Sequence, residues 1–151
     1  MRISEFLTPQ DIFPDLKATG KKQVLQELAS FASERLGIED RAIFDVLVER
    51  ERLGTTGFGN GVAIPHGRMR QLDKLNMMFA RLSTPVAFDA VDGRPVDLLF
   101  LLLTPENAGA DHLTALAKAS RILRDESLCA KLRGAETAEA IYSTILESEQ
   151  E

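Results

Sequence analysis

The residues with the clearest capacity for chemistry are two histidines, His66 and His112, and one arginine, Arg50. His66 stands in the stretch GTTGFGNGVAIPHGRM (residues 54–69), directly after a short apolar run and a proline. A neutral imidazole in that position can attack phosphorus or bind a metal ion. From the pattern alone, however, a lone histidine after a strand is more often structural than reactive.

A metal site at His66 would need further ligands at a recognisable spacing. The chain offers only His112, Cys129 and carboxylates without such spacing, so we expect neither a metal ion nor a cofactor. A nucleophilic His66 would need donors for the transferred oxygens, and the backbone amides around Gly67 and the side chain of Arg68 lie close in sequence. The nucleophile is the better of the two chemical interpretations.

Arg50 and His112 each have a chemical and a structural interpretation. At helical spacing, Arg50 projects beside Ile43 inside an apolar arc, where it can hold phosphoryl oxygens or simply lie at a helix end. His112 begins a predicted helix on the face of Leu116 and Ala119, a position that favours a neutral imidazole. The two interpretations of Arg50 are evenly supported, and spacing alone favours a packed, hydrogen-bonded His112.

The glycines at positions 54, 57, 59 and 61 first suggest a phosphate-binding loop. A dinucleotide-binding fingerprint requires a strand, a glycine-rich turn and then a helix, whereas here a helix precedes the glycines and a strand follows. The GK[ST] sequence of a P-loop is missing as well. A tight connection explains these glycines equally well.

The predicted elements that carry these residues form a layered α/β fold with a mixed sheet. Apolar residues at helical spacing predict helices, and short apolar runs predict strands. The predicted helices are 21–36 (ended by Gly37), 40–53, 111–123 (with Asp111 as N-cap), 128–132 and 137–146; the predicted strands are 62–64, 75–82 and 96–103. Strand 96–103 is apolar at nearly every position, which is typical of a central strand covered on both faces.

Weaker signals complete the predicted layout. Residues 3–7 fit an edge strand or a first turn, and residues 147–151 fit a frayed end. Thr84-Pro85 and Asp92-Gly93 carry turn signals between the two long strands. We find no repeat or linker, so we expect residues 1–151 to form one domain whose core strands lie mostly between residues 62 and 103.

Composition excludes several classes of function. The chain has 151 residues, 27% of them charged and 44% hydrophobic, values that are ordinary for a soluble globular protein. Its net charge of −5 argues against nucleic acid or an anionic membrane surface as a partner. One cysteine, Cys129, cannot form an internal disulfide, which suits the cytoplasm. We find no signal pattern, and the apolar run 98–103 is too short to cross a bilayer, so we expect no membrane insertion.

A longer stretch resembles a known family. REXLGTTGFGNGVAIPHGR (residues 50–68, with X standing for Arg52) is similar to the signature of the enzyme IIA domains of the bacterial phosphoenolpyruvate-dependent phosphotransferase system, fructose/mannitol class. The resemblance continues through AFDAVDGRPVDLLFLLLTPE (87–106) and ADHLTALAKASRILRD (110–125), which look most like the nitrogen-regulatory branch. It covers essentially the whole chain, although the first twenty residues match only loosely.

The resemblance implies a site, a fold and a donor. His66 matches the family's phosphoryl acceptor, modified on Nε2, while Arg50 matches its supporting arginine and His112 its second active-site histidine. The implied fold is a mixed sheet of about five strands flanked by helices on both sides. The implied donor is an HPr-like phosphocarrier that an enzyme I charges from phosphoenolpyruvate. The residues expected to surround the phosphoryl group are Gly67, Arg68 and Asn60.

Three functions follow as hypotheses. The branch-like residues after Phe88 favour a cytoplasmic phosphotransferase component that regulates partners through its phosphorylation state, with potassium transport and sensor kinase systems as expected target classes. The first alternative is a sugar-specific enzyme IIA that passes phosphate to a IIB domain for transport. The second is a binding module without catalysis, in which His66 is structural.

Overall fold

A long buried strand, β6 (Val96–Pro105), occupies the centre of the sheet in the computed structural model, which describes residues 1–149. Its side chains alternate between two apolar clusters, one on each face. Leu98, Phe100 and Leu102 belong to the first cluster, and Leu99, Leu101 and Leu103 belong to the second. The strand is apolar at successive positions because helices cover both faces of the sheet. The predicted central strand is confirmed.

The sheet is mixed and has six strands in the described residues, in the order β1-β5-β6-β3-β2, with β4 also paired to β6. β6 pairs antiparallel with β5 on one side and parallel with both β3 and β4 on the other. β1 extends the sheet parallel to β5, and β2 pairs antiparallel with β3. The remaining strands are β1 (Ile12–Leu16), β2 (Gly57–Gly59), β3 (Val62–Ala63), β4 (His66–Met69) and β5 (Asn76–Val86).

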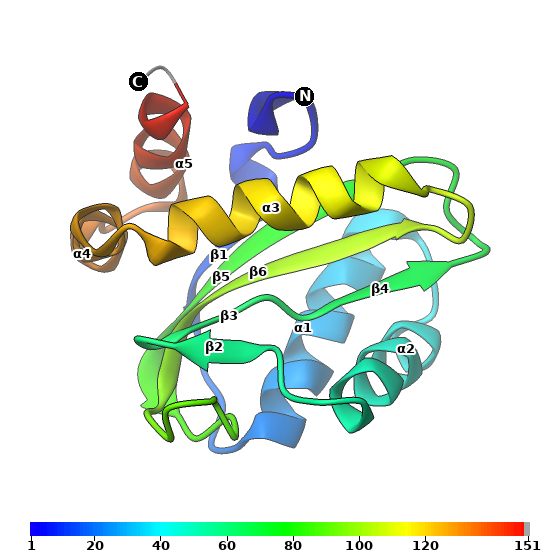
Figure 1. Ribbon diagram of the computed structural model, residues 1–151, viewed down its shortest axis with the longest axis horizontal. Helices are drawn as coiled ribbons and strands as arrows, with labels where there is room; N and C mark the ends of the chain where they lie inside the picture. The colour runs from blue at the N-terminus through cyan, green and yellow to red at the C-terminus, as the bar shows by residue number, and fades with distance from the viewer. Residues whose placement is uncertain (150–151) are drawn as a thin grey trace.

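Helices cover both faces of this sheet, as expected (Figure 1). The pair α1 (Lys21–Leu36) and α2 (Asp40–Arg52) packs on one face, and α2 also contacts β4. The other face carries α3 (Ala110–Arg124), α4 (Glu126–Gly134) and α5 (Ala138–Ser148), together with two short 3₁₀ helices, η1 (Ile3–Glu5) and η2 (Pro9–Asp11). Within residues 1–149, no helix has both the length and the apolar character that a bilayer crossing requires.

The glycine-rich segment is more ordered than its composition predicts. Gly57–Gly59, expected as part of a loop, forms strand β2. The strand predicted over residues 62–64 ends at Ala63, and a separate strand that we did not predict begins after Pro65, so His66 is the first residue of β4 rather than a residue beyond the last strand of this segment. Proline has no N–H to donate to β6, which separates β3 from β4. The carbonyl of Pro65 still accepts the amide of Leu102, at 3.1 Å, and this keeps His66 in register beside β6.

Three other boundaries differ from the prediction. β1 was not predicted, because Pro14 interrupts its pattern; the strand lies at the sheet edge, where proline is tolerated. β5 continues to Val86 through the expected turn at Thr84-Pro85, with an irregular register after Arg81. Of the two alternatives expected over residues 3–7, the structure has a turn and not an edge strand: η1 is one turn of 3₁₀ helix that ends at Glu5.

Two helix ends differ from the prediction: the start of α3 and the end of α5. Asp111 is not the N-cap of α3: the helix begins at Ala110, the N-cap is Gly109, and Asp111 lies in the first turn. At the other end of the chain, α5 reaches Ser148 and the carboxylate of Glu149 accepts the amide of Ile3, at 2.9 and 3.0 Å. The prediction of a frayed end is therefore wrong for residues 147–149, which are held in place by α5 and by this hydrogen bond. Residues 150 and 151 lie outside the described residues.

Candidate functional site

His66 is held by its own backbone so that one ring nitrogen is left for chemistry. Its Nδ1 lies 2.8 Å from the carbonyl oxygen of Ile64, two residues earlier. A carbonyl only accepts hydrogen bonds, so this contact requires the proton on Nδ1. In the neutral ring Nε2 then carries the lone pair. The turn at Pro65 thus selects the tautomer with an unprotonated Nε2, which is the form that a nucleophilic role for this atom requires.

Arg50, near the C-terminal end of α2, faces that lone pair. Its Nε–H donates to Nε2 of His66 at 3.1 Å, and its Nη1 donates to the carbonyl of Gly54 at 2.8 Å. Both partners are neutral, and Arg50 forms no ion pair with any carboxylate in residues 1–149. A guanidinium has five N–H groups, so three remain for an incoming anion.

His112 lies beside His66, with ring centroids 5.5 Å apart. Its Nδ1 is 2.7 Å from the hydroxyl of Thr104, at the end of β6. That hydroxyl is fully buried and has this ring as its partner, so donating its proton to Nδ1 leaves neither group unsatisfied. The proton of His112 then sits on Nε2, as a donor. The structure thus brings together the three predicted residues from α2, β4 and α3.

Burial and neighbouring charges lower the pKa of both imidazoles, which favours their neutral form. Burial is the main cause that lowers the pKa of His66; the Ile64 carbonyl opposes it, Arg50 lowers the pKa further, and Glu51 raises it. The pKa of His112 is lowered by burial, then by His66 and by Arg68. A neutral ring retains the lone pair that nucleophilic attack requires.

The three residues predicted to surround a phosphoryl group have different environments. Gly67 lies under α2, where a β-carbon would overlap Cγ1 of Val46, so only glycine allows α2 to approach β4 this closely. Arg68 is exposed on β4 and close enough to His112 to lower its pKa. Asn60 occupies the turn between β2 and β3; its backbone N–H donates to Asp92 at 2.9 Å. Within residues 1–149, the hydrogen bonds of Asn60 are with Asp92 and Arg94, from the β5–β6 connection, and with Arg133 of α4, and none is with a histidine.

Sequence reasoning missed the groups that orient these side chains. The Ile64 carbonyl and the Thr104 hydroxyl fix the two ring tautomers, and Glu51 holds the turn after α2. Thr104 had a readable signal, since it is the polar residue that ends an apolar strand and comes directly before Pro105. The Ile64 carbonyl had no such signal, because every residue type carries a backbone carbonyl.

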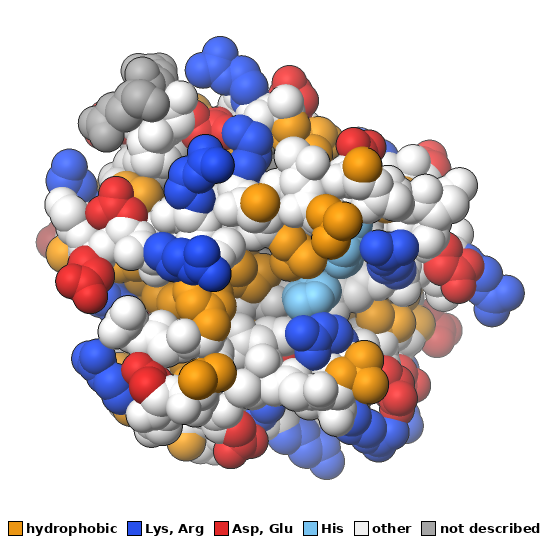
Figure 2. Space-filling view, in the orientation of Figure 1, with side chains coloured by type: hydrophobic (Ala, Val, Ile, Leu, Met, Phe, Trp, Pro, Cys, Tyr) orange, Lys and Arg blue, Asp and Glu red, His pale blue; other side chains and the backbone are white. Residues whose placement is uncertain are grey.

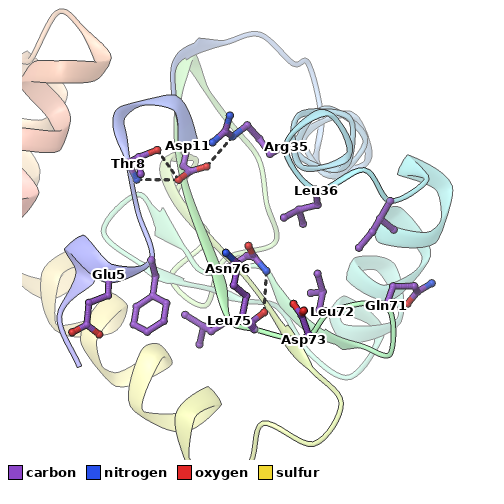
Figure 3. Close-up of a pocket in the computed structure, with 13 residues that line it drawn as sticks. Glu5, Thr8, Asp11, Arg35, Leu36, Gln71, Leu72, Asp73, Leu75 and Asn76 are labelled. Atoms are coloured by element: carbon purple, nitrogen blue, oxygen red, sulfur yellow. Dashed lines mark hydrogen bonds and ion pairs between the residues drawn. The ribbon is translucent and has the colours of Figure 1, made fainter.

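The site lies on the surface rather than in a deep cavity. In Figure 2 the two imidazoles adjoin on one face, with Lys or Arg side chains on both sides of them. A cavity of about 460 Å³ lies elsewhere, between η2, the end of α1 and the β4–β5 connection (Figure 3). Its cation Arg35 is already paired with Asp11 at 2.9 Å. No cluster of three or more His, Cys, Asp or Glu residues suited to a metal ion occurs in residues 1–149.

Comparisons with known proteins agree on one family. The family model described as "Phosphoenolpyruvate-dependent sugar phosphotransferase system, EIIA 2" matches residues 5–148. A nitrogen regulatory protein of Bradyrhizobium diazoefficiens is 54% identical over 145 residues, which covers 96% of this chain and 95% of the relative. A fructose-specific EIIA component of Haloferax volcanii is 37% identical over 128 residues, or 84% of this chain and 83% of that one.

A solved structure gives the same answer for the fold. The crystal structure of nitrogen regulatory protein IIA-Ntr from Neisseria meningitidis superposes with a TM-score of 0.89 at 36% identity, covering 95% of this chain and 98% of that one. The match includes the open mixed sheet with helices on both faces. The chain belongs to the EIIA type 2 family of the phosphoenolpyruvate-dependent phosphotransferase system, and its similar relatives include nitrogen regulatory proteins.

Proposed function

We propose that this chain accepts a phosphoryl group on Nε2 of His66 from an HPr-like phosphocarrier and regulates partner proteins through its phosphorylation state. One observation carries the proposal: Nδ1 of His66 is committed to the Ile64 carbonyl, while Nε2 faces an arginine that has no carboxylate partner in the described residues. The family match over residues 5–148 supports the whole chain acting as one such domain. The proposed donor, which is charged from phosphoenolpyruvate, supports the expectation that the reaction is cytoplasmic.

The geometry supports a direct transfer between two nitrogens. The lone pair of Nε2 attacks phosphorus and forms the new N–P bond, while the electron pair of the broken N–P bond returns to the carrier's nitrogen. The Nε–H of Arg50 must leave Nε2 as the bond forms, and it then becomes a donor to a phosphoryl oxygen. The Nε2–H of His112 supplies a second donor from the neighbouring ring.

The surface suits a protein donor better than a small molecule. Leu53 follows α2 directly and is 84% exposed, and Leu113 follows His112 and is 65% exposed. Large apolar side chains left in water beside polar groups are typical of surfaces that bind proteins. Both leucines belong to segments that also carry a site residue, so a carrier that reaches His66 would cover them.

Regulation is favoured over transport by the degree of similarity. The relative named as a nitrogen regulatory protein is 54% identical and the fructose-specific component 37% identical. Transport remains the second candidate because of that fructose-specific relative. The two functions separate in one assay: a transport component passes its phosphoryl group to a IIB domain, whereas a regulator retains it and changes its binding to targets in a pull-down from cell extract.

The phosphorylation itself is tested with purified proteins. The chain is mixed with phosphoenolpyruvate, enzyme I and the phosphocarrier, and intact mass is measured before and after acid or alkali. We expect a gain of one phosphate that acid removes and alkali preserves, as for phosphorus on nitrogen. Omitting the phosphocarrier should prevent the gain. No mass gain in the complete mixture, or an acid-stable and alkali-labile adduct, would contradict the proposal.

A further inference from the structure

We propose that Glu51 is the positioning residue of this site, because its carboxylate fixes the turn that orients both Arg50 and His66. The inference rests on the function proposed above and names a residue with no recorded hydrogen bond to either side chain. Glu51 comes directly after Arg50 on α2, and its side chain is only 7% exposed. A carboxylate buried to this extent needs partners for both oxygens.

Glu51 finds those partners at the far end of the turn. Its Oε1 accepts the amide of Thr56 at 3.0 Å, and its Oε2 accepts the Thr56 hydroxyl at 2.5 Å. The ammonium of Lys21, at the start of α1, lies 3.0 Å from Oε1. The carboxylate therefore closes residues 51–56 into a ring that joins the last turn of α2 to β2.

The first consequence of this ring concerns Arg50. Gly54 lies inside the ring with φ near +143°, a conformation open to glycine, and its amide donates to the carbonyl of Glu51 at 3.1 Å. The Gly54 carbonyl is the acceptor for Nη1 of Arg50. Because the ring fixes this carbonyl, it also fixes the plane of the guanidinium that faces His66.

The second consequence concerns His66. The carbonyl of Thr56 accepts the amide of Ile64 at 3.1 Å, and the carbonyl of Ile64 accepts Nδ1–H of His66. Thr56 therefore connects the Glu51 carboxylate to the group that sets the tautomer of the acceptor ring. Glu51 is therefore connected to the anchors of both reactive residues: its backbone carbonyl accepts the Gly54 amide, and its carboxylate accepts the amide and hydroxyl of Thr56.

A purely stabilising role is the alternative. Glu51 could serve only to join α1 to α2 through Lys21, whose ammonium also lies 3.7 Å from Asp89 and 4.8 Å from the ring centroid of Phe88. That role predicts a lower melting temperature with an unchanged transfer rate. Positioning predicts a slower transfer step at saturating phosphocarrier and a changed environment for the His66 ring nitrogens.

The test compares Glu51→Ala and Glu51→Gln with Glu49→Ala as the matched control. Glu49 is an exposed glutamate on the same helix, paired with Arg52. We expect Glu51→Ala to slow single-turnover transfer at saturating carrier by about ten- to a hundredfold, the effect of misplaced reacting groups. Glu51→Gln keeps an acceptor for the Thr56 amide and should restore most of the rate. Carrier affinity should be unchanged in all three variants.

Nitrogen-15 NMR of the unphosphorylated protein gives a second readout that needs no carrier. The Nε2 resonance of His66 should shift in Glu51→Ala, as the contact with Arg50 is lost, and stay unchanged in Glu49→Ala. In an Arg50→Ala background the rate penalty of Glu51→Ala should shrink. If Glu51→Ala does not fold, Thr56→Val removes one of the two hydrogen bonds and should give smaller changes in the same direction.

The outcomes separate this inference from the proposed function. A wild-type chain that gains no phosphate overturns the proposed function, and the NMR comparison then decides the positioning role. A folded Glu51→Ala protein with normal transfer, or with an unshifted His66 ring, overturns the positioning role while the proposed function stands.

Discussion

Two arginines of this molecule differ in their hydrogen-bond partners: Arg133 is paired with a carboxylate, whereas Arg50, within residues 1–149, donates only to neutral groups. Arg133, on α4, donates to both oxygens of Asp97 through Nε and Nη2 at 2.9–3.1 Å, and Nη2 also reaches the carbonyl of Asn60 at 3.2 Å. Its side-chain hydrogen bond with Asp97 is the main cause that raises the pKa of Arg133. Arg50 instead donates to an imidazole nitrogen and a carbonyl.

The difference lies in whether the charge of the arginine is balanced by a carboxylate within the fold. The charge of Arg133 is neutralised within the fold, so this residue ties α4 to β6 and to the β2–β3 turn. The charge of Arg50 has no carboxylate partner in the described residues, so it stays available for an incoming anion. Arg50 and Arg133 therefore differ in whether a carboxylate balances the guanidinium charge, and we predict that Arg50 is the one of the two that contacts a ligand.

The largest expected effect comes from removing the acceptor. His66→Ala should abolish phosphorylation with little loss of stability, because the ring is only partly buried. Asp97→Ala should lower the stability but leave phosphorylation intact, since it removes the carboxylate partner of Arg133. Intact mass after the complete reaction and thermal unfolding measure both effects. Phosphorylation of His66→Ala, or loss of it in a folded Asp97→Ala protein, would break the comparison.

A fall in pH should slow phosphoryl transfer to His66, because the imidazole becomes protonated, while Arg133 keeps its charge. Burial lowers the pKa of His66 below its ordinary value, so transfer should hold at pH 7 and drop about tenfold per unit below the folded-state pKa. Between about 6.5, the ordinary pKa, and that lower value, the unfolded chain binds more protons, so stability also declines with falling pH. Single-turnover rates and melting temperatures between pH 8 and 5 test this, and a flat rate would show that another step is limiting.

Replacing each arginine by lysine sharpens the comparison at constant charge. Arg50→Lys should slow transfer by about tenfold or more, because an ammonium cannot contact Nε2, the Gly54 carbonyl and a phosphoryl group together. Arg133→Lys should leave transfer intact and cost about 1 kcal/mol, or about 2–4 °C in melting temperature. Equal transfer rates for the two variants would mean that Arg50 is only a helix-end arginine.

His112 should give the smallest effect at the site. His112→Ala removes the Nε2–H donor and should slow transfer by about tenfold, within the roughly 1–3 kcal/mol that the loss of one donor to a charged group costs. His112→Gln keeps a donor of similar reach and should transfer almost normally. Complete loss in both folded variants would make His112 essential to the reaction, whereas wild-type rates in both would make it a core residue.

Periodic apolar patterns predicted most of the fold. The helices α1 and α2 and the strands β5 and β6 were readable because each buries one face or both. β1 and β2 were not, since proline and glycine within them are typical of loops and their pairing depends on neighbouring strands. The N-cap of α3 was misplaced because aspartate also favours the first turn of a helix, where it lies here.

The sequence named the residues of the candidate site, whose roles stay predictions, but it did not reveal the hydrogen bonds that connect them. His66, Arg50 and His112 followed from the resemblance, and their mutual contacts agree with it. Which ring nitrogen is free depends on the Ile64 carbonyl, and a backbone group has no sequence signature of its own. Asn60 stands in the same motif as His66, yet its hydrogen bonds are with Asp92, Arg94 and Arg133.

The contact between Gly67 and Val46 makes the spacing of the site adjustable. Val46 lies one helical turn before Arg50 on α2, and Gly67 follows His66 on β4, so the thickness of this contact sets how far the guanidinium stands from the imidazole. Combining Gly67→Ala with Val46→Ala would add one methyl group to the strand and remove two from the facing helix residue. Protein engineers could thereby tune the reach of the arginine without changing either reacting side chain.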